Sequence, residues 1–130
     1  MEDSAFSDEF CRFLQTTVHS VDAAELLLLL SRQPGQWWEP AALAGALRPA
    51  STMTDADVLR YLEQFQTGSL IAVGPDKRVQ YRPRSDELAA HVRILADAYR
   101  ERPVTLFRVI YAMRDLKIRS FADAFKLRRN

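Results

Sequence analysis

Between residues 20 and 82 the order of the segments strongly constrains the fold. A helical segment comes first, then a very short extended one, two more helical segments, and two β-type segments around a tight turn. Because hydrophobic periodicity is the main signal of secondary structure, this order predicts a mostly α (α+β) fold with one small antiparallel sheet. The segments are Asp22–Gln33, Gln36–Glu39, Pro40–Leu47, Thr54–Gly68, Leu70–Val73 and Val79–Arg82.

The first helical segment of this series contains the uninterrupted apolar run Leu26–Leu30. Consecutive leucines cover more than half of a helix's circumference, so this helix is expected to lie at the centre of the fold. Asp22 and Glu25 have the spacing of a capping box at its start, and Pro34-Gly35 ends it.

Two adjacent tryptophans, Trp37 and Trp38, make up the middle of the short extended segment. Side chains of neighbouring strand residues point to opposite faces. One indole is therefore expected in the core, and the other is either covered by a neighbouring element or exposed. Both could stack on nucleobases, but packing is the preferred interpretation.

The third helix is expected to begin at the N-cap Thr54, with Asp57 three residues later, and to end in a left-handed conformation at Gly68. Its other face is polar and mostly acidic. Its buried stripe is expected to consist of Val58, Leu59, Leu62 and Phe65.

A turn rich in Gly, Pro and Asp, residues 74–78, separates the two β-type segments and predicts a hairpin. Its tip and base are basic. These charges are expected either to contact a polyanion or to keep the hairpin soluble. They belong to Lys77, Arg78, Arg82 and Arg84.

Further helical segments flank this series. One is predicted from about Ser4 to Gln15, and another carries a stripe of Leu88, Val92, Leu95 and Tyr99. The segment Val104–Met113 is apolar almost all round and is expected to be buried; a last helix is predicted over Ser120–Arg128. These patterns divide the chain into an N-terminal amphipathic helix (1–20), a central domain (21–84) and a C-terminal helical extension (85–130).

The flanking helices carry more apolar surface than a central domain of about 60 residues can cover. We therefore predict a homodimer formed by these helices. The residues expected at its interface are Phe6, Phe10, Phe13, Leu106, Phe107 and Ile110.

The charge distribution and the cysteine content restrict the classes of function that the sequence allows. The net charge is only +1, but residues 1–66 hold ten acidic and four basic side chains, whereas residues 67–130 hold seven acidic and fourteen basic ones. This asymmetry predicts either an internal electrostatic fit or a polar binding face. The single cysteine, Cys11, excludes an internal disulfide, and with His19 and His91 it has no spacing typical of a metal site.

Catalytic motifs are absent from the sequence. There is no phosphate-binding glycine loop, paired-histidine motif or nucleophile elbow, so neither an enzyme nor a cofactor is expected. The N-terminus does not resemble a signal peptide, and no apolar run is long enough to span a bilayer. A cytoplasmic protein without membrane contact is the expectation.

The stretch from Thr54 to Ile71, with Gly68-Ser69-Leu70-Ile71 leading into the hairpin, resembles bacterial winged-helix proteins, loosely the MarR-type and PadR-type regulators. The resemblance covers residues 22–82, roughly half of the chain. It implies that the third helix enters the major groove of DNA and that the hairpin, or wing, contacts phosphates or the minor groove. The implied reading residues are Thr52, Thr54, Asp57, Arg60 and Gln64, and the implied wing residues are Lys77, Arg78, Arg82 and Arg84.

Two functions follow as expectations. The first is a transcriptional regulator whose homodimer binds double-stranded DNA at successive grooves. The second arises because the third helix carries Asp55, Asp57 and Glu63 against the single Arg60, whereas DNA affinity comes mainly from neutralised phosphates. In that alternative the acidic helix binds another regulatory protein and does not contact DNA directly.

Overall fold

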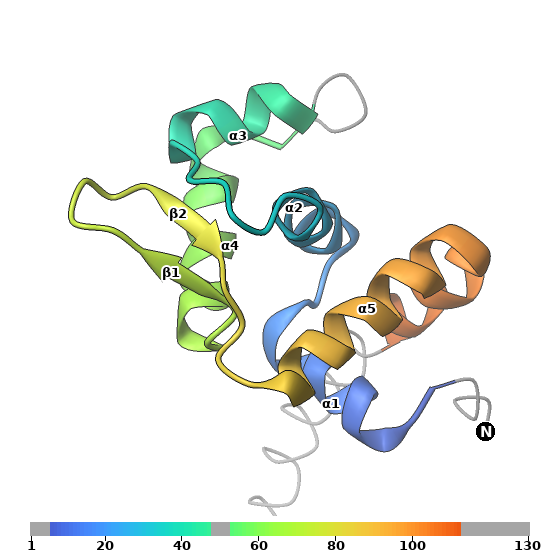
Figure 1. Cartoon of the computed structure of the whole chain (residues 1–130). Helices are drawn as coiled ribbons and strands as arrows, with labels where there is room; N and C mark the ends of the chain where they lie inside the picture. The colour runs from blue at the N-terminus through green and yellow to red at the C-terminus, as the bar shows by residue number, and fades with distance from the viewer. Residues whose placement is uncertain (1–5, 48–52, 113–130) are drawn as a thin grey trace, which may run out of the picture.

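The computed structural model describes residues 6–47 and 53–112 of the 130-residue chain. It confirms a mostly helical protein with one two-stranded antiparallel sheet (Figure 1). A further helix, Pro103–Ala112, follows α5. The labelled elements are α1 (Asp8–Thr17), α2 (Val21–Ser31), α3 (Pro40–Leu47), α4 (Asp55–Thr67), β1 (Ile71–Val73), β2 (Val79–Tyr81) and α5 (Asp86–Glu101).

Helix α2 lies at the centre, as the leucine run predicts. It packs against α3, α4, α5 and β2, and four of its five consecutive leucines are buried. Its N-cap is Ser20, whose Oγ accepts a hydrogen bond from the backbone N–H of Ala23 at 3.0 Å. The predicted cap Asp22 is therefore wrong, because Ser20 already has the extended backbone of an N-cap and the helix begins at Val21.

Helix α4 begins with the predicted capping box. The Thr54 hydroxyl accepts from the N–H of Asp57, and the Asp57 carboxylate accepts from the N–H of Thr54, both at 3.1 Å. The predicted buried stripe is wrong at Leu59, which is 57% exposed, while Tyr61 is buried. Helical geometry explains the difference: position 61 lies three residues from Val58 on the same face, whereas position 59 is turned by about 100°.

The end of α4 differs from the expectation at Gly68. Its φ is −81°, and the left-handed residue is Ser69, with φ of 64°. Glycine at position 68 is explained by close packing, since a Cβ atom there would lie 3.0 Å from Cγ2 and 3.1 Å from Oγ1 of Thr17. The requirement for glycine thus comes from contact with α1 and not from the backbone conformation.

Strands β1 and β2 form the predicted hairpin, with Ile71 opposite Tyr81 and Val73 opposite Val79. The predicted strand at residues 36–39 is reduced to one antiparallel bridge between Trp38 and Val79. Two backbone hydrogen bonds of 2.8 and 2.9 Å hold this bridge. The segment before α3 is thereby fixed to the hairpin.

The flanking helices belong to the same core as the central elements. In the helix Pro103–Ala112, Leu106 and Ile110 are buried, but Val104 is 65% and Tyr111 54% exposed. The expectation that this segment is buried all round is therefore wrong, because within the described residues only one side of the helix is covered. The predicted helix Ser120–Arg128 lies outside the described residues.

Among the described residues no single helix is both long and apolar enough to cross a membrane. Only α1 and α2 taken together reach that length and hydropathy, and they meet at an angle of 99°.

Tyr99 ties α5 to α2 through its hydroxyl, which donates to Oε2 of Glu25 at 2.7 Å. Burial raises the pKa of Tyr99 from 10.0 to about 12, and the hydrogen bond to Glu25 adds to the shift. A raised pKa means that this stabilisation is complete below about pH 10 and is lost as the pH rises towards 12.

Tyr99→Phe should lower the free energy of unfolding by about 1–2 kcal/mol at neutral pH and flatten the decline of stability at alkaline pH. Urea unfolding across this pH range measures both; an unchanged alkaline decline would contradict the assignment.

Candidate functional site

The outward face of α4 carries most of the residues expected to read DNA, but their side chains are not equally available. Thr54 is exposed, although its hydroxyl is used in the capping box. Gln64 is half-buried, and its Oε1 lies inside the protein without a hydrogen-bond partner among the described residues. In this conformation the acceptor atom of Gln64 faces inward, so its implied role as a reading residue requires the side chain to turn outward and stays a prediction. Thr52 lies outside the described residues.

Arg60 is the single cation of α4, and it is engaged within the helix. Its Nη2 lies 3.0 Å from Oδ1 of Asp57, and its guanidinium lies 5.3 Å from the ring centroid of Tyr61. The N–H of Thr54 lowers the pKa of Asp57, and Arg60 lowers it further. Asp57 therefore stays ionised and holds Arg60. Because exposed pairs of this kind contribute little stability, Arg60 can still turn to an external partner.

Leu59 adds an apolar side chain to this acidic face. It is exposed and lies one helical turn from both Asp55 and Glu63, which are also exposed. The exposure of Leu59 is not evident from the sequence, because an apolar residue beside a buried stripe is expected to belong to that stripe. The buried face of α4 is defined by the helical spacing of Val58, Tyr61, Leu62 and Phe65. Leu59 does not fit this spacing.

The hairpin projects from the body of the molecule (Figure 1). Two basic residues, Lys77 and Arg78, lie in its turn, and two more, Arg82 and Arg84, directly follow β2 at its base. Lys77, Arg82 and Arg84 are exposed and form no ion pair within the part of the chain that the structure describes. The backbone N–H groups of Arg82 and Arg84 donate to Leu70 and Ser69, each at 2.9 Å. Both arginines are thus anchored beside the turn that ends α4.

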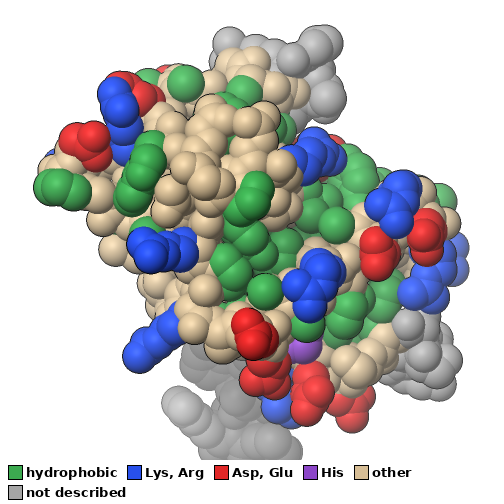
Figure 2. All heavy atoms as spheres, in the orientation of Figure 1, with side chains coloured by type: hydrophobic (Ala, Val, Ile, Leu, Met, Phe, Trp, Pro, Cys, Tyr) green, Lys and Arg blue, Asp and Glu red, His purple; other side chains and the backbone are tan. Residues whose placement is uncertain are grey.

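Arg78 differs from the other three. Its guanidinium lies 3.5 Å from Glu39 and 3.6 Å from Asp76. Figure 2 agrees with this arrangement, since acidic side chains accompany the basic ones at the hairpin tip, whereas basic side chains stand alone nearer its base. The free positive charge of the hairpin therefore lies mainly on Lys77, Arg82 and Arg84.

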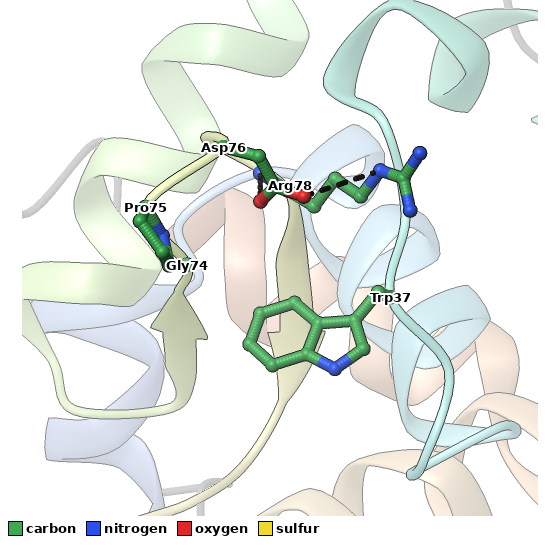
Figure 3. A pocket seen from close by; sticks show the side chains of 5 residues that line it. All are labelled: Trp37, Gly74, Pro75, Asp76 and Arg78. Atoms are coloured by element: carbon green, nitrogen blue, oxygen red, sulfur yellow. Dashed lines mark hydrogen bonds and ion pairs between the residues drawn. The ribbon is translucent and has the colours of Figure 1, made fainter.

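A hollow of about 470 Å³ lies between the hairpin turn and Trp37. Figure 3 shows the indole below the turn, with Gly74 and Pro75 to one side and Asp76 above. Trp37 is 42% exposed, whereas Trp38 packs against the core, as the alternation of neighbouring strand residues predicts. Sequence alone did not indicate which of the two indoles is outside.

A second hollow, of about 520 Å³, lies at the junction of α1 and α4. It is lined mostly by residues with polar side chains, which come from the C-terminal ends of α1 and α4. They are Thr16, Thr17, Glu63, Gln64, Thr67 and Gly68.

The residues expected at a dimer interface lie inside the single chain. Phe6 packs against Phe10, Phe10 and Phe13 pack against each other and against His91 of α5, and Leu106 and Ile110 are fully buried. Phe107 is half-buried against Tyr99. The assignment to an interface is wrong for the five buried residues, because other parts of the same chain cover them. For the half-buried Phe107 it stays a prediction. Dimerisation itself stays a prediction, and Val104 and Tyr111 are exposed apolar residues on the same helix as Leu106 and Ile110.

The described residues contain no group of three or more histidine, cysteine, aspartate or glutamate side chains placed to hold a metal ion. Comparison with known proteins gives no match: no family model, no curated protein and no solved structure is significantly similar to this chain. The interpretation of the site therefore depends on its geometry alone.

Proposed function

We propose that this chain is a winged-helix protein that binds double-stranded DNA and acts as a cytoplasmic transcriptional regulator. The element order supports the fold: α2, the bridge at Trp38, α3, α4 and the β1–β2 hairpin follow one another as the helices, first strand and wing of that architecture do. In this assignment α4 is the helix that faces the major groove, and the hairpin is the wing.

The observation that carries the proposal is the set of free cations on the hairpin. Lys77 in the hairpin turn and Arg82 and Arg84 at the hairpin base are exposed and without ion pairs among the described residues. Binding to duplex DNA gains most of its free energy from such groups as they replace condensed counterions on the phosphates. The wing therefore supplies affinity in this proposal.

Helix α4 contributes less to affinity. Its acids Asp55, Asp57 and Glu63 outnumber Arg60, so its approach to phosphates costs free energy. Arg60 is the side chain in position to recognise guanine once it leaves Asp57. We therefore expect weak sequence preference and strong salt dependence. Two copies, if they associate, would meet successive grooves.

A second function is favoured by Leu59, whose exposed side chain stands between two carboxylates on α4. Such a face suits a protein partner that offers an apolar pocket with basic residues around it. In this alternative the module is an adaptor, and DNA contacts are dispensable.

Binding to random duplex DNA over a range of salt concentrations distinguishes the two functions. If the wing binds phosphates, the logarithm of the association constant should fall linearly with the logarithm of salt, with a slope of about −3 for three contacts. The protein should also be retained on heparin. The absence of binding in both assays would refute the DNA proposal, and a co-purifying protein lost in Leu59→Glu would support the adaptor.

A further inference from the structure

We propose that Trp37 and the hairpin turn form a stacking site for one unpaired nucleobase. This inference depends on the proposed DNA-binding function and adds a ligand class to it. Binding by the wing cations alone would be indifferent to base pairing, whereas this site would favour DNA in which a base has left the helix.

Trp37 is held in place by its neighbours in the sequence. The backbone N–H and C=O of Trp38 both bond to Val79, at 2.8 and 2.9 Å. On the other side, Nε2 of Gln80 donates to the carbonyl of Gly35 at 3.0 Å. The indole of Trp37 is thus presented outward by a segment that is anchored to β2 at two points, which limits the entropy lost when a ligand binds.

One edge of the indole lies against the hairpin turn. A Cβ atom at Gly74 would lie 3.3 Å from Cζ3 and 3.6 Å from Cη2 of Trp37, so glycine at this position allows the ring to approach. The hollow beside the ring holds about 470 Å³, which is within the range of small-ligand sites. The ring and the exposed Pro75 give it two apolar walls (Figure 3).

The remaining lining of the hollow is polar. Oδ1 of Asp76 accepts from the N–H of Arg78 at 3.1 Å. Oδ2 forms an ion pair with Nε of Arg78 at 3.6 Å, which is longer than a hydrogen bond, so it can still accept a hydrogen bond from a ligand. The Arg78 guanidinium supplies donors. A nucleobase fits this combination because it has a flat apolar face together with N–H donors and carbonyl acceptors on its edge.

The surroundings favour a nucleotide over a peptide side chain. Lys77 follows Asp76 directly and is exposed, with no ion pair among the described residues. It can hold the phosphate of a nucleotide whose base lies on Trp37. In intact duplex the faces of each base are covered by its neighbours. Access to the indole therefore requires a base at a bulge, an end or a melted segment.

Tryptophan fluorescence tests this inference directly, because the chain contains two tryptophans. In Trp38→Phe, Trp37 is the single reporter. This change should be tolerated, since Nε1 of Trp38 is buried without a hydrogen-bond partner among the described residues. The probes are three duplexes of equal length: one with a single unpaired adenine, one fully paired, and one with an abasic site in place of that adenine.

The unpaired adenine should quench the fluorescence of Trp37 and bind about 10-fold more tightly than the other two probes, the usual scale for stacking of one base on an aromatic ring. In the wild-type background Trp37→Ala should abolish this preference, and Trp37→Phe should retain part of it. Equal affinity for all three probes with normal salt dependence would overturn the stacking site alone. Failure to bind any probe would overturn the DNA-binding function as well.

Discussion

Replacing Phe10 with alanine is expected to lower the free energy of unfolding by about 3–5 kcal/mol. Phe10 is 1% exposed. Its ring centroid lies 5.1 Å from that of Phe6, 6.0 Å from that of Phe13 and 6.1 Å from that of His91. These rings come from two helices and the residues before α1. The cavity that alanine would leave at position 10 therefore cannot close without displacing a helix. The loss is a large part of the about 5–15 kcal/mol that stabilises an ordinary domain.

Thermal or urea unfolding measures this effect, and the midpoint temperature should fall by about 10–20 °C. Leu59→Ala is the matched control: Leu59 is 57% exposed, so its truncation should change the stability by no more than about 0.5 kcal/mol. Phe10→Leu keeps most of the apolar volume and should lose less, which preserves the test if the alanine variant does not fold.

The same variant distinguishes packing within one chain from contact between copies. If Phe10 belongs to the internal core, its truncation should cost the same at every protein concentration. If Phe10 belonged to an interface, the unfolding midpoint of the wild type would rise with protein concentration. The difference in midpoint between wild type and variant would then also depend on protein concentration. A concentration-dependent difference would thus contradict the burial of α1 within the chain.

Features determined by close neighbours in the sequence were predictable. The Thr54–Asp57 capping box involves two side chains three residues apart, and residues 74–78 close the hairpin by their own turn chemistry. The central position of α2 is equally predictable, because a helix with leucines around most of its surface cannot be stable at the periphery. These signals also fix the order of elements that supports the winged-helix proposal.

What covers a given apolar face was not predictable in the same way. The rings of Phe10 and Phe13 lie against His91, which is far away in the sequence, and periodicity cannot distinguish such a partner from a second copy. The same limit affects the candidate site. The inward turn of Gln64 and the exposure of Trp37 depend on α1 and on the hairpin, neither of which is local to them.

Reversing two hairpin charges should have the largest effect on DNA binding. The variant Lys77→Asp/Arg82→Glu is expected to bind duplex DNA roughly 100-fold more weakly at about 0.1 M salt, with a salt slope smaller by about 2. Aspartate is chosen at position 77 because Lys77 has a φ of 68°, a left-handed conformation that aspartate tolerates. The loss should be similar for all DNA sequences, since phosphate contacts carry no sequence information directly.

Arg12→Glu/Arg108→Glu is the matched control, because it changes the net charge equally at exposed residues of α1 and of the helix Pro103–Ala112, away from the hairpin (Figure 1). Gel-shift or anisotropy titrations of both variants show whether DNA affinity depends on where the charges lie or on the net charge of the protein. An effect confined to the hairpin variant locates the phosphate contacts on the wing. Equal weakening in both variants would instead reflect the electrostatic field of the whole protein. Unchanged binding by the hairpin variant would favour α4, with its exposed Leu59 and its carboxylates, as the binding surface.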